Sequence, residues 1–276
     1  MLYQYLRIIK GVDLSLNNQD ENQVLSLGIS TGEYIYIGQY FPFNNLFFWV
    51  DSPNVNSAVL GVQYWANKEW IDAVDVLDGT SVSGVPFAQS GVIQFSPKRD
   101  KNFWQEVEDT SEVSQQNPPE LNGHTIYDLY WIRIKTSANL SATDLKRVTY
   151  AFTTSQQLSK LDVEVNQFLN AFESGKLDWT REIITATELM IRDLMRRGLV
   201  VNRGQVLRFD DVSIPCDLKT LSLIYSNLGN AYKDKRLEKE SEYEQAINIR
   251  NFTFDQNNNG AVDKAEVGVK VSRFIR

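Results

Sequence analysis

The sequence has few of the residues on which most catalytic and metal centres depend. Its 276 residues include one cysteine, Cys216, and one histidine, His124. A disulfide or a cysteine-based zinc site within one chain is therefore excluded, and a Ser-His or Cys-His catalytic pair would have to use His124. Cys216 precedes a predicted helix, where its pKa could fall, but a lone cysteine is more often an inert small residue. No phosphate-binding G-x-x-x-x-G-K or zinc-binding H-E-x-x-H motif is present. We therefore expect a protein that is not an enzyme.

Long apolar runs and an excess of positive charge are also missing. No segment approaches the length that spans a membrane, and Met1 to Arg7 lack the basic leader and apolar stretch of a secretory signal. The 28 Lys and Arg against 35 Asp and Glu give a net charge of −7. This balance argues against a general nucleic-acid coat, which would be basic. We expect a soluble protein made in the cytoplasm.

Residues 1–155 contain many short apolar and aromatic runs separated by turn residues. This spacing is typical of an antiparallel β-sandwich. We expect its last strands at Tyr127–Lys135 and Val148–Phe152. The sandwich contains five tryptophans, and we expect most of them in the core because they lie inside strand patterns. Stacking on sugar rings is the alternative. The five positions are Trp49, Trp65, Trp70, Trp104 and Trp131.

Residues 156–276 change to a helical period, so the chain is expected to be α+β with two domains. Apolar residues from Ile183 to Met195 share a helical face that Gly198 ends. A long C-terminal helix is predicted to begin near Pro215, with Asp210 and Asp211 in the loop before it. Its apolar face continues into a densely charged half that ends near Ile247. The helices are expected to pack as a small bundle.

A twelve-residue stretch after this helix fits the calcium-loop pattern D-x-[DN]-x-[DN]-G-x5-E. Gly260 would make its sharp turn, and the other defined positions would supply an all-oxygen shell for Ca²⁺. The predicted ligands are Asp255, Asn257, Asn259, Ala261, Asp263 and Glu266. An EF-hand needs a helix on each side, and Asn251 to Phe254 are predicted to be extended. A plain Asx turn between two short strands is the alternative, and no other cofactor is expected.

The last ten residues alternate between apolar and polar side chains, as a strand does. No partner strand is evident in the helical domain, so we expect the tail to pair with another chain by β-augmentation. A strand folded back on its own sandwich or a frayed end is the alternative. The predicted docking residues are Val267, Val269, Val271, Arg273, Phe274 and Arg276.

Residues 160–276 contain three features in a fixed order. These are a predicted helix with a charged second half, an Asp/Asn/Gly loop and a tail that ends in arginine. This order resembles the head-tail connector proteins, also called adaptor or neck proteins, of tailed bacteriophages. The resemblance implies a homo-oligomeric, dodecameric ring that lines the DNA channel of the virion neck without touching a membrane. It also implies contact with the portal protein on one side, where the tail docks, and with stopper, tail-terminator or tail nozzle proteins on the other. Such a ring would be assembled in the host cytoplasm.

The N-terminal domain carries a second resemblance. The order of Val62–Trp65, Trp70, Asp78–Thr80, Gln89–Gly91 and Tyr130–Arg133 is similar to a jelly-roll-like β-sandwich module of phage tail and neck proteins. In a connector, such a module would be a decoration or a platform for tail fibre or collar proteins. A carbohydrate-binding or adhesin module with a helical attachment domain is the alternative function. A glycosidase with two paired carboxylates is the third.

Overall fold

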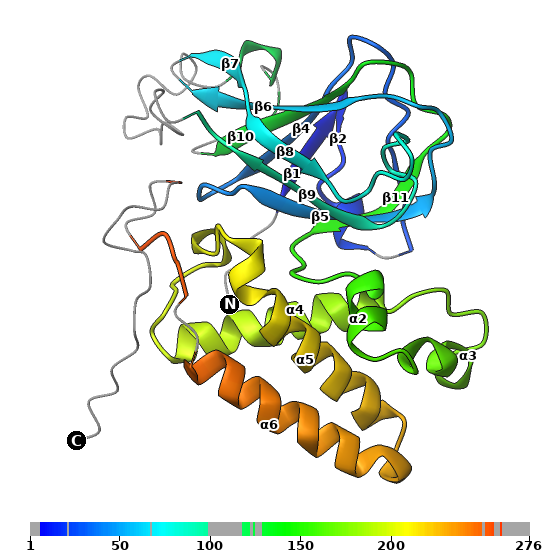
Figure 1. The fold of residues 1–276 in the computed structure, drawn as a ribbon. Coiled ribbons are helices and arrows are strands. Elements are labelled where there is room, and N and C mark those ends of the chain that lie inside the picture. Colours follow the sequence, from blue (N-terminus) through cyan, green and yellow to red (C-terminus); the bar gives the residue numbers. More distant parts are fainter. Residues whose placement is uncertain are drawn as a thin grey trace. The chain divides into compact units, whose positions relative to one another are not determined.

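The fold was analysed in a computed structural model that describes residues 6–20, 22–66, 68–98, 118–121, 124, 129–249, 252–256 and 260. The chain divides between Thr149 and Tyr150 into two compact units. The first unit is built from strands and the second from helices, so the described part of the chain is α+β (Figure 1). The division lies a few residues before the predicted boundary at residue 155. Independent folding of two domains stays a prediction.

The first unit contains two antiparallel sheets. One has six strands in the order β2-β1-β4-β10-β6-β7, and the other has five in the order β3-β11-β5-β9-β8 (Figure 1). The six-stranded sheet comprises β1 (Arg7–Lys10), β2 (Val12–Asp13), β4 (Ile35–Gln39), β6 (Leu60–Ala66), β7 (Glu69–Asp72) and β10 (Tyr130–Thr136). The five-stranded sheet comprises β3 (Leu25–Ser26), β5 (Asn45–Ser52), β8 (Val74–Asp78), β9 (Gly91–Ser96) and β11 (Asp144–Thr149).

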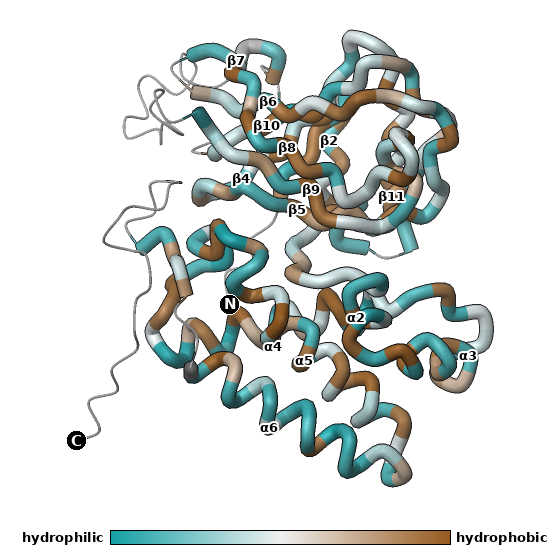
Figure 2. The backbone as a smooth tube through the Cα atoms, viewed as in Figure 1, coloured by the Kyte–Doolittle hydropathy of each residue, from teal (hydrophilic) through white to brown (hydrophobic). Residues whose placement is uncertain are grey.

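The strands form where β-branched and aromatic residues alternate with residues that fit the opposite face of a sheet. In β10, Tyr130, Ile132 and Ile134 are buried. Arg133 and Lys135, whose side chains lie on the opposite face, are partly exposed. The first five residues of β5 are buried, and Figure 2 shows hydrophobic and hydrophilic stretches alternating along the strands of this unit. Apolar burial on the inward faces therefore fixes the register of the sheets.

Two predicted strands have shifted ends. The strand expected over Tyr127–Lys135 spans Tyr130–Thr136 among the described residues. The strand expected over Val148–Phe152 is β11, which ends at Thr149. The next residues turn into the helical unit, where Phe152 is fully buried. Its ring packs on Phe209 of the helical unit, with ring centroids 6.4 Å apart.

The second unit is built around three long helices, α4 (Thr180–Arg196), α5 (Phe209–Asn227) and α6 (Lys233–Ile249). Shorter helices α2 (Ser155–Leu161) and α3 (Leu169–Phe172) precede them. Single 3-10 turns lie at Val165–Phe168, Arg203–Gln205 and Asn230–Tyr232. In α4 the predicted apolar face is correct, since Ile183, Met190 and Leu194 are all fully buried. Gly198, with a φ of +69°, follows its C-terminal end.

The helix predicted to begin at Pro215 begins earlier, at Phe209, so that prediction is wrong. Pro215 lies inside α5, and Asp210 and Asp211 are in its first turn and not in a preceding loop. Phe209 and Val212 are buried, so packing extends the helix toward its N-terminus despite the proline. The two acidic side chains stand where the helix dipole favours negative charge.

The prediction of a single long C-terminal helix is also wrong, because Gly229 separates α5 from α6. Gly229 has a φ of +87°, a left-handed conformation that ends a helix and that side-chain-bearing residues rarely adopt. The chain reverses there, and α6 packs beside α5 (Figure 1). The result is a helical hairpin in place of one projecting rod.

Candidate functional site

One face of the six-stranded sheet carries a row of hydrogen-bonded side chains that crosses four strands. Arg133 on β10 is paired with Tyr36 on β4 and with Gln63 on β6, and Gln63 is paired with Asp72 on β7. Cross-strand partners lie on the same face of a sheet. We call the face that carries Tyr36, Arg133, Gln63 and Asp72 the Arg133 face.

Arg133 is held rigidly at the centre of this row. Its guanidinium carbon lies 4.0 Å from the ring centroid of Tyr34 and 4.6 Å from that of Trp70. Its Nε donates to Oε1 of Gln63 at 2.6 Å, and Nε2 of Gln63 donates to Oδ1 of Asp72 at 2.9 Å. Cation–π contacts and hydrogen bonds of this kind immobilise a side chain that is otherwise flexible.

A row of aromatic rings runs beside the polar row. Trp65 is paired with Trp70 across β6 and β7, and their ring centroids are 5.2 Å apart in an edge-to-face arrangement. Trp131, fully buried, lies over Gly38 of β4. Tyr36, Trp65 and Trp70 pack on an apolar cluster formed by Ile9, Leu121, Leu129 and Trp131.

The expectation that most tryptophans lie in the core is thus only partly correct. Trp131 is fully buried and Trp49 is 8% exposed, but Trp65 and Trp70 are partly exposed on the Arg133 face. Trp104 lies outside the described residues. Strand alternation places Trp65 opposite the buried Tyr64 and Trp70 opposite the buried Ile71, whereas Trp131 is fully buried although it lies on the same face as Arg133.

Two glycines allow long side chains to lie flat on the Arg133 face. A Cβ on Gly38 would stand 2.8 Å from the Trp131 ring, whereas a Cβ on Gly61 would stand 3.0 Å from Cε of Lys135. Gly38→Ala is therefore expected to lower the free energy of unfolding by roughly 1–3 kcal/mol, because a buried ring must move.

Gly61→Ala is the matched control, since only the mobile end of a lysine has to shift. We expect its unfolding midpoint in urea to stay close to that of the unmodified chain. Equal midpoints for the two variants would show that Trp131 does not need the space above Gly38.

The charges on the Arg133 face are paired. Lys135 Nζ contacts Oδ1 of Asp72 at 2.9 Å, and Arg133 approaches Oε1 of Glu120 at 3.5 Å. The hydrogen bond from Lys135 is the main reason that the pKa of Asp72 lies below its usual value. Burial raises the pKa of Tyr36. The face thus combines aromatic rings, an amide and paired charges.

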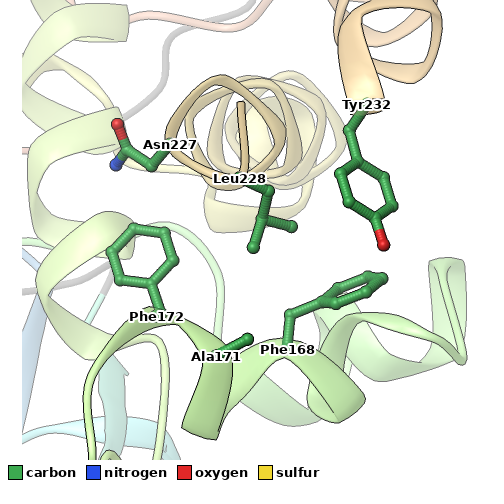
Figure 3. A pocket seen from close by; sticks show the side chains of 6 residues that line it. All are labelled: Phe168, Ala171, Phe172, Asn227, Leu228 and Tyr232. Atoms are coloured by element: carbon green, nitrogen blue, oxygen red, sulfur yellow. The ribbon is translucent and has the colours of Figure 1, made fainter. Parts of the chain in front are cut away.

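The helical unit has a pocket between α3 and the end of α5. It has a volume of about 320 Å³. Figure 3 shows the rings of Phe168, Phe172 and Tyr232 around Leu228, with Asn227 at the edge. Phe168 and Tyr232 meet edge to face at 5.0 Å. Asn227 and Tyr232 bring a side-chain amide and a hydroxyl to the lining.

Helix α6 buries only a narrow edge. Tyr243 and Ile247 are buried, and the Tyr243 hydroxyl donates to Asp193 of α4 at 2.8 Å. Most of the remaining surface is Lys and Glu, which appears as a mainly hydrophilic tube in Figure 2. Leu237 is 44% exposed within it. We call the exposed surface of α6 around Leu237 the α6 face.

The lone cysteine and a neighbouring aspartate lie in the interior of the helical unit. Cys216 is fully buried inside α5, and burial raises the pKa of its thiol to about 12. The interpretation that a helix start lowers this pKa is therefore wrong. Asp217 is 4% exposed, accepts a hydrogen bond from the Thr153 hydroxyl, and has a pKa raised to about 6 by burial. His124 is partly exposed and lies in the first unit, whereas Cys216 is buried in the second.

The start of the predicted calcium loop is described, but most of it is not. Asp255 is buried, and its backbone N–H donates to the carbonyl of Gln205 at 3.0 Å. Gly260 has a φ of +79°, as a sharp turn requires. Helix α6 ends at Ile249 and residues 252–255 are not helical, so no helix leads directly into the loop. The other predicted ligands, Asn257, Asn259, Ala261, Asp263 and Glu266, lie outside the described residues.

The predicted docking tail, Val267 to Arg276, also lies outside the described residues. Within the described ranges, no group of three or more His, Cys, Asp or Glu side chains is arranged to hold a metal ion. Calcium binding by the loop and docking by the tail stay predictions. Among the described helices, none combines the length and apolar character needed to cross a membrane.

Neither a protein family nor a curated protein matches the chain.

Proposed function

We propose that the chain is a structural protein of a tailed-phage virion, an adaptor ring in the neck that joins the portal to the tail. The helical hairpin of α5 and α6, followed by the Asp/Asn/Gly loop and the basic tail, supports this proposal. In it the sheet unit is a jelly-roll-like sandwich that serves as decoration or as a platform for fibre or collar proteins. The protein acts by assembly and not by catalysis.

The α6 face is the single observation that carries the proposal. A 17-residue helix buries only a narrow edge and fixes opposite charges along its exposed surface. Lys239 contacts Glu242 at 2.9 Å, and Lys235 contacts Glu164 at 2.6 Å. Alternating charges around one exposed leucine suit a polar interface between identical subunits, where charge pairs set the register. We place the ring contact on this face.

The ring is tested by measuring the mass of the full chain in solution by light scattering, with negative-stain imaging of the particles. We expect closed rings, a dodecamer by the resemblance. Leu237→Glu places a charge at the centre of the α6 face and is expected to shift rings toward monomers. Leu177, which is 90% exposed in the same unit, provides the matched control Leu177→Glu.

Two results would overturn the proposal. One is a monomer at all protein concentrations, and the other is equal loss of rings in Leu237→Glu and Leu177→Glu. Portal docking is tested separately by deleting Val267 to Arg276 and asking whether the ring still joins portal-containing heads. Normal joining would remove the tail from the interface while leaving the ring intact.

A further inference from the structure

We propose that the α6 face of one subunit binds a different surface on the next copy of the chain, the outer surface of α4. This inference rests on the proposed ring and names the other half of its contact. A ring of identical subunits needs two different surfaces that fit each other, because a single self-complementary patch closes a dimer. The charges, the exposed apolar residues and the lengths of the two helices support this pairing.

The outer surface of α4 is formed by exposed residues that recur at helical spacing. We call it the α4 face, and its members are Arg181, Thr185, Arg192, Met195 and Arg196. Steps of three, four and seven residues place them on one side of the helix. The opposite side, with Ile183, Met190 and Leu194, is buried. The α4 face thus contains three arginines and no carboxylate.

Positive charge dominates the α4 face. Arg196 is 78% exposed, whereas the carboxylate that it approaches at 3.7 Å, that of Asp193, is 23% exposed. Arg192 forms no ion pair among the residues that the structure describes. Arg181 approaches Glu173 at 3.6 Å, and both side chains are exposed. The two arginines near the end of α4 are therefore available to carboxylates of another chain.

On the α6 face the carboxylates are the more exposed partners of their ion pairs. Lys239 lies 3.3 Å from Glu238, and the two side chains are 19% and 60% exposed. Arg197 lies 2.8 Å from Glu244, and these side chains are 17% and 57% exposed. The exposed charged residues of α6 are Lys233, Asp234, Glu238, Glu240 and Glu244. The α6 face therefore presents negative charge, opposite in sign to that of the α4 face.

The two faces also match in apolar content and in length. Met195 on the α4 face is 36% exposed, and Leu237 on the α6 face is 44% exposed. Methionine adapts its shape to a partner, and methionine and arginine are enriched at protein interfaces. Both helices have 17 residues and are therefore about 25 Å long. Surfaces of equal length, each with one exposed apolar residue, can pack side by side.

The position of the two helices within the unit suits a contact that repeats. Helix α5 packs against both α4 and α6 (Figure 1). The two faces belong to different helices, so a copy that binds one neighbour through its α6 face still presents its α4 face to the next. Repetition of such a head-to-tail contact produces a ring when the rotation closes.

The test measures the mass of the full chain by light scattering over a range of protein concentrations. Arg192→Glu with Arg196→Glu gives both faces a negative charge and is expected to raise the concentration needed for assembly more than about tenfold. Glu238→Lys with Glu240→Lys gives both faces a positive charge and is expected to have the same effect. Circular dichroism establishes that each double variant is folded.

An equimolar mixture of the two double variants is expected to assemble again, because each negative face then meets a positive face on the other variant. The matched control is Lys160→Glu with Arg208→Glu, which changes the net charge by the same amount as the arginine variant. Lys160 and Arg208 are exposed cations of the same unit, in α2 and before α5, and lie on neither face. This control is expected to assemble like the unmodified chain.

Two outcomes would overturn this pairing while leaving the ring itself in place. One is that the unmodified chain forms rings and Arg192→Glu with Arg196→Glu assembles as well as the control. The other is that the folded double variants fail to assemble when they are mixed, which would show that the two faces do not meet. A monomeric unmodified chain is a different result, because it would remove the ring and this contact together.

Discussion

Lys176→Met is expected to lower the free energy of unfolding of the helical unit by roughly 3–5 kcal/mol, because it leaves the Glu182 carboxylate buried without a counter-charge. Lys176 Nζ contacts Oε1 of Glu182 at 2.9 Å, and the two side chains are only 8% and 10% exposed. The same ammonium lies 5.0 Å from the Phe172 ring centroid and 5.1 Å from that of Trp179. The other carboxylate oxygen, Oε2, is buried without a partner, so solvent cannot replace the lost cation.

The pair itself contributes much less than its removal costs, because both charges were taken out of water to form it. The double variant Lys176→Met with Glu182→Met is therefore expected to recover most of the loss. Urea unfolding followed by circular dichroism at 222 nm measures all three chains in a double-mutant cycle. Equal stabilities for the single and double variants would disprove the buried-charge explanation.

An exposed pair of the same type is the control. Lys235 contacts Glu164 at 2.6 Å, a shorter distance than in the buried pair, but the side chains are 39% and 52% exposed. Solvent screening limits such pairs to about 0–1 kcal/mol, so Lys235→Met is expected to change stability little. Burial, and not distance, decides which of the two lysines matters.

Asp217→Asn is expected to stabilise the helical unit at neutral pH and to remove part of its pH dependence. The folded pKa of Asp217 is raised to about 6, mainly by burial, from an ordinary value of 3.8. The folded state therefore holds this proton more tightly than the unfolded state. The resulting stabilisation is complete below pH 3.8 and is lost as the pH rises through about 6. A shift of that size corresponds to roughly 3 kcal/mol at pH 7 and above.

Urea unfolding between pH 4 and pH 8 measures this effect. The unmodified chain is expected to lose stability across the range, while Asp217→Asn changes less and the two curves converge near pH 4. A curve for Asp217→Asn that runs parallel to that of the unmodified chain would show that this carboxyl is not the titrating group.

The sequence predicted the type of most elements because their apolar spacing is regular. Ile183 to Leu194 recur at helical intervals and are buried as expected. Two features of the helical unit were not predictable from spacing. Pro215 usually marks a helix start, yet burial of Phe209 extends the helix past it. Gly229 lies in a pattern that continues through it, and only its positive φ reveals the reversal.

The grouping of side chains on the Arg133 face could not be predicted from the sequence, for a different reason. Alternation along β6 and β10 places Gln63 and Arg133 away from the core residues, but it does not say which strands are neighbours. Strand β10 lies between β4 and β6, far from both in the sequence. Only this order brings Tyr36, Arg133 and Gln63 into one row. The long-range pairing of strands is therefore the information that the sequence pattern lacked.

The buried position of Cys216 has a practical consequence for biophysical work on this protein. Because the only native thiol is inside α5 and stays protonated near neutral pH, maleimide reagents should leave the folded chain unlabelled. A cysteine introduced at an exposed position, such as Leu177, would then be the sole reactive thiol. Fluorophores or spin labels can thus be attached one at a time without first constructing a cysteine-free background.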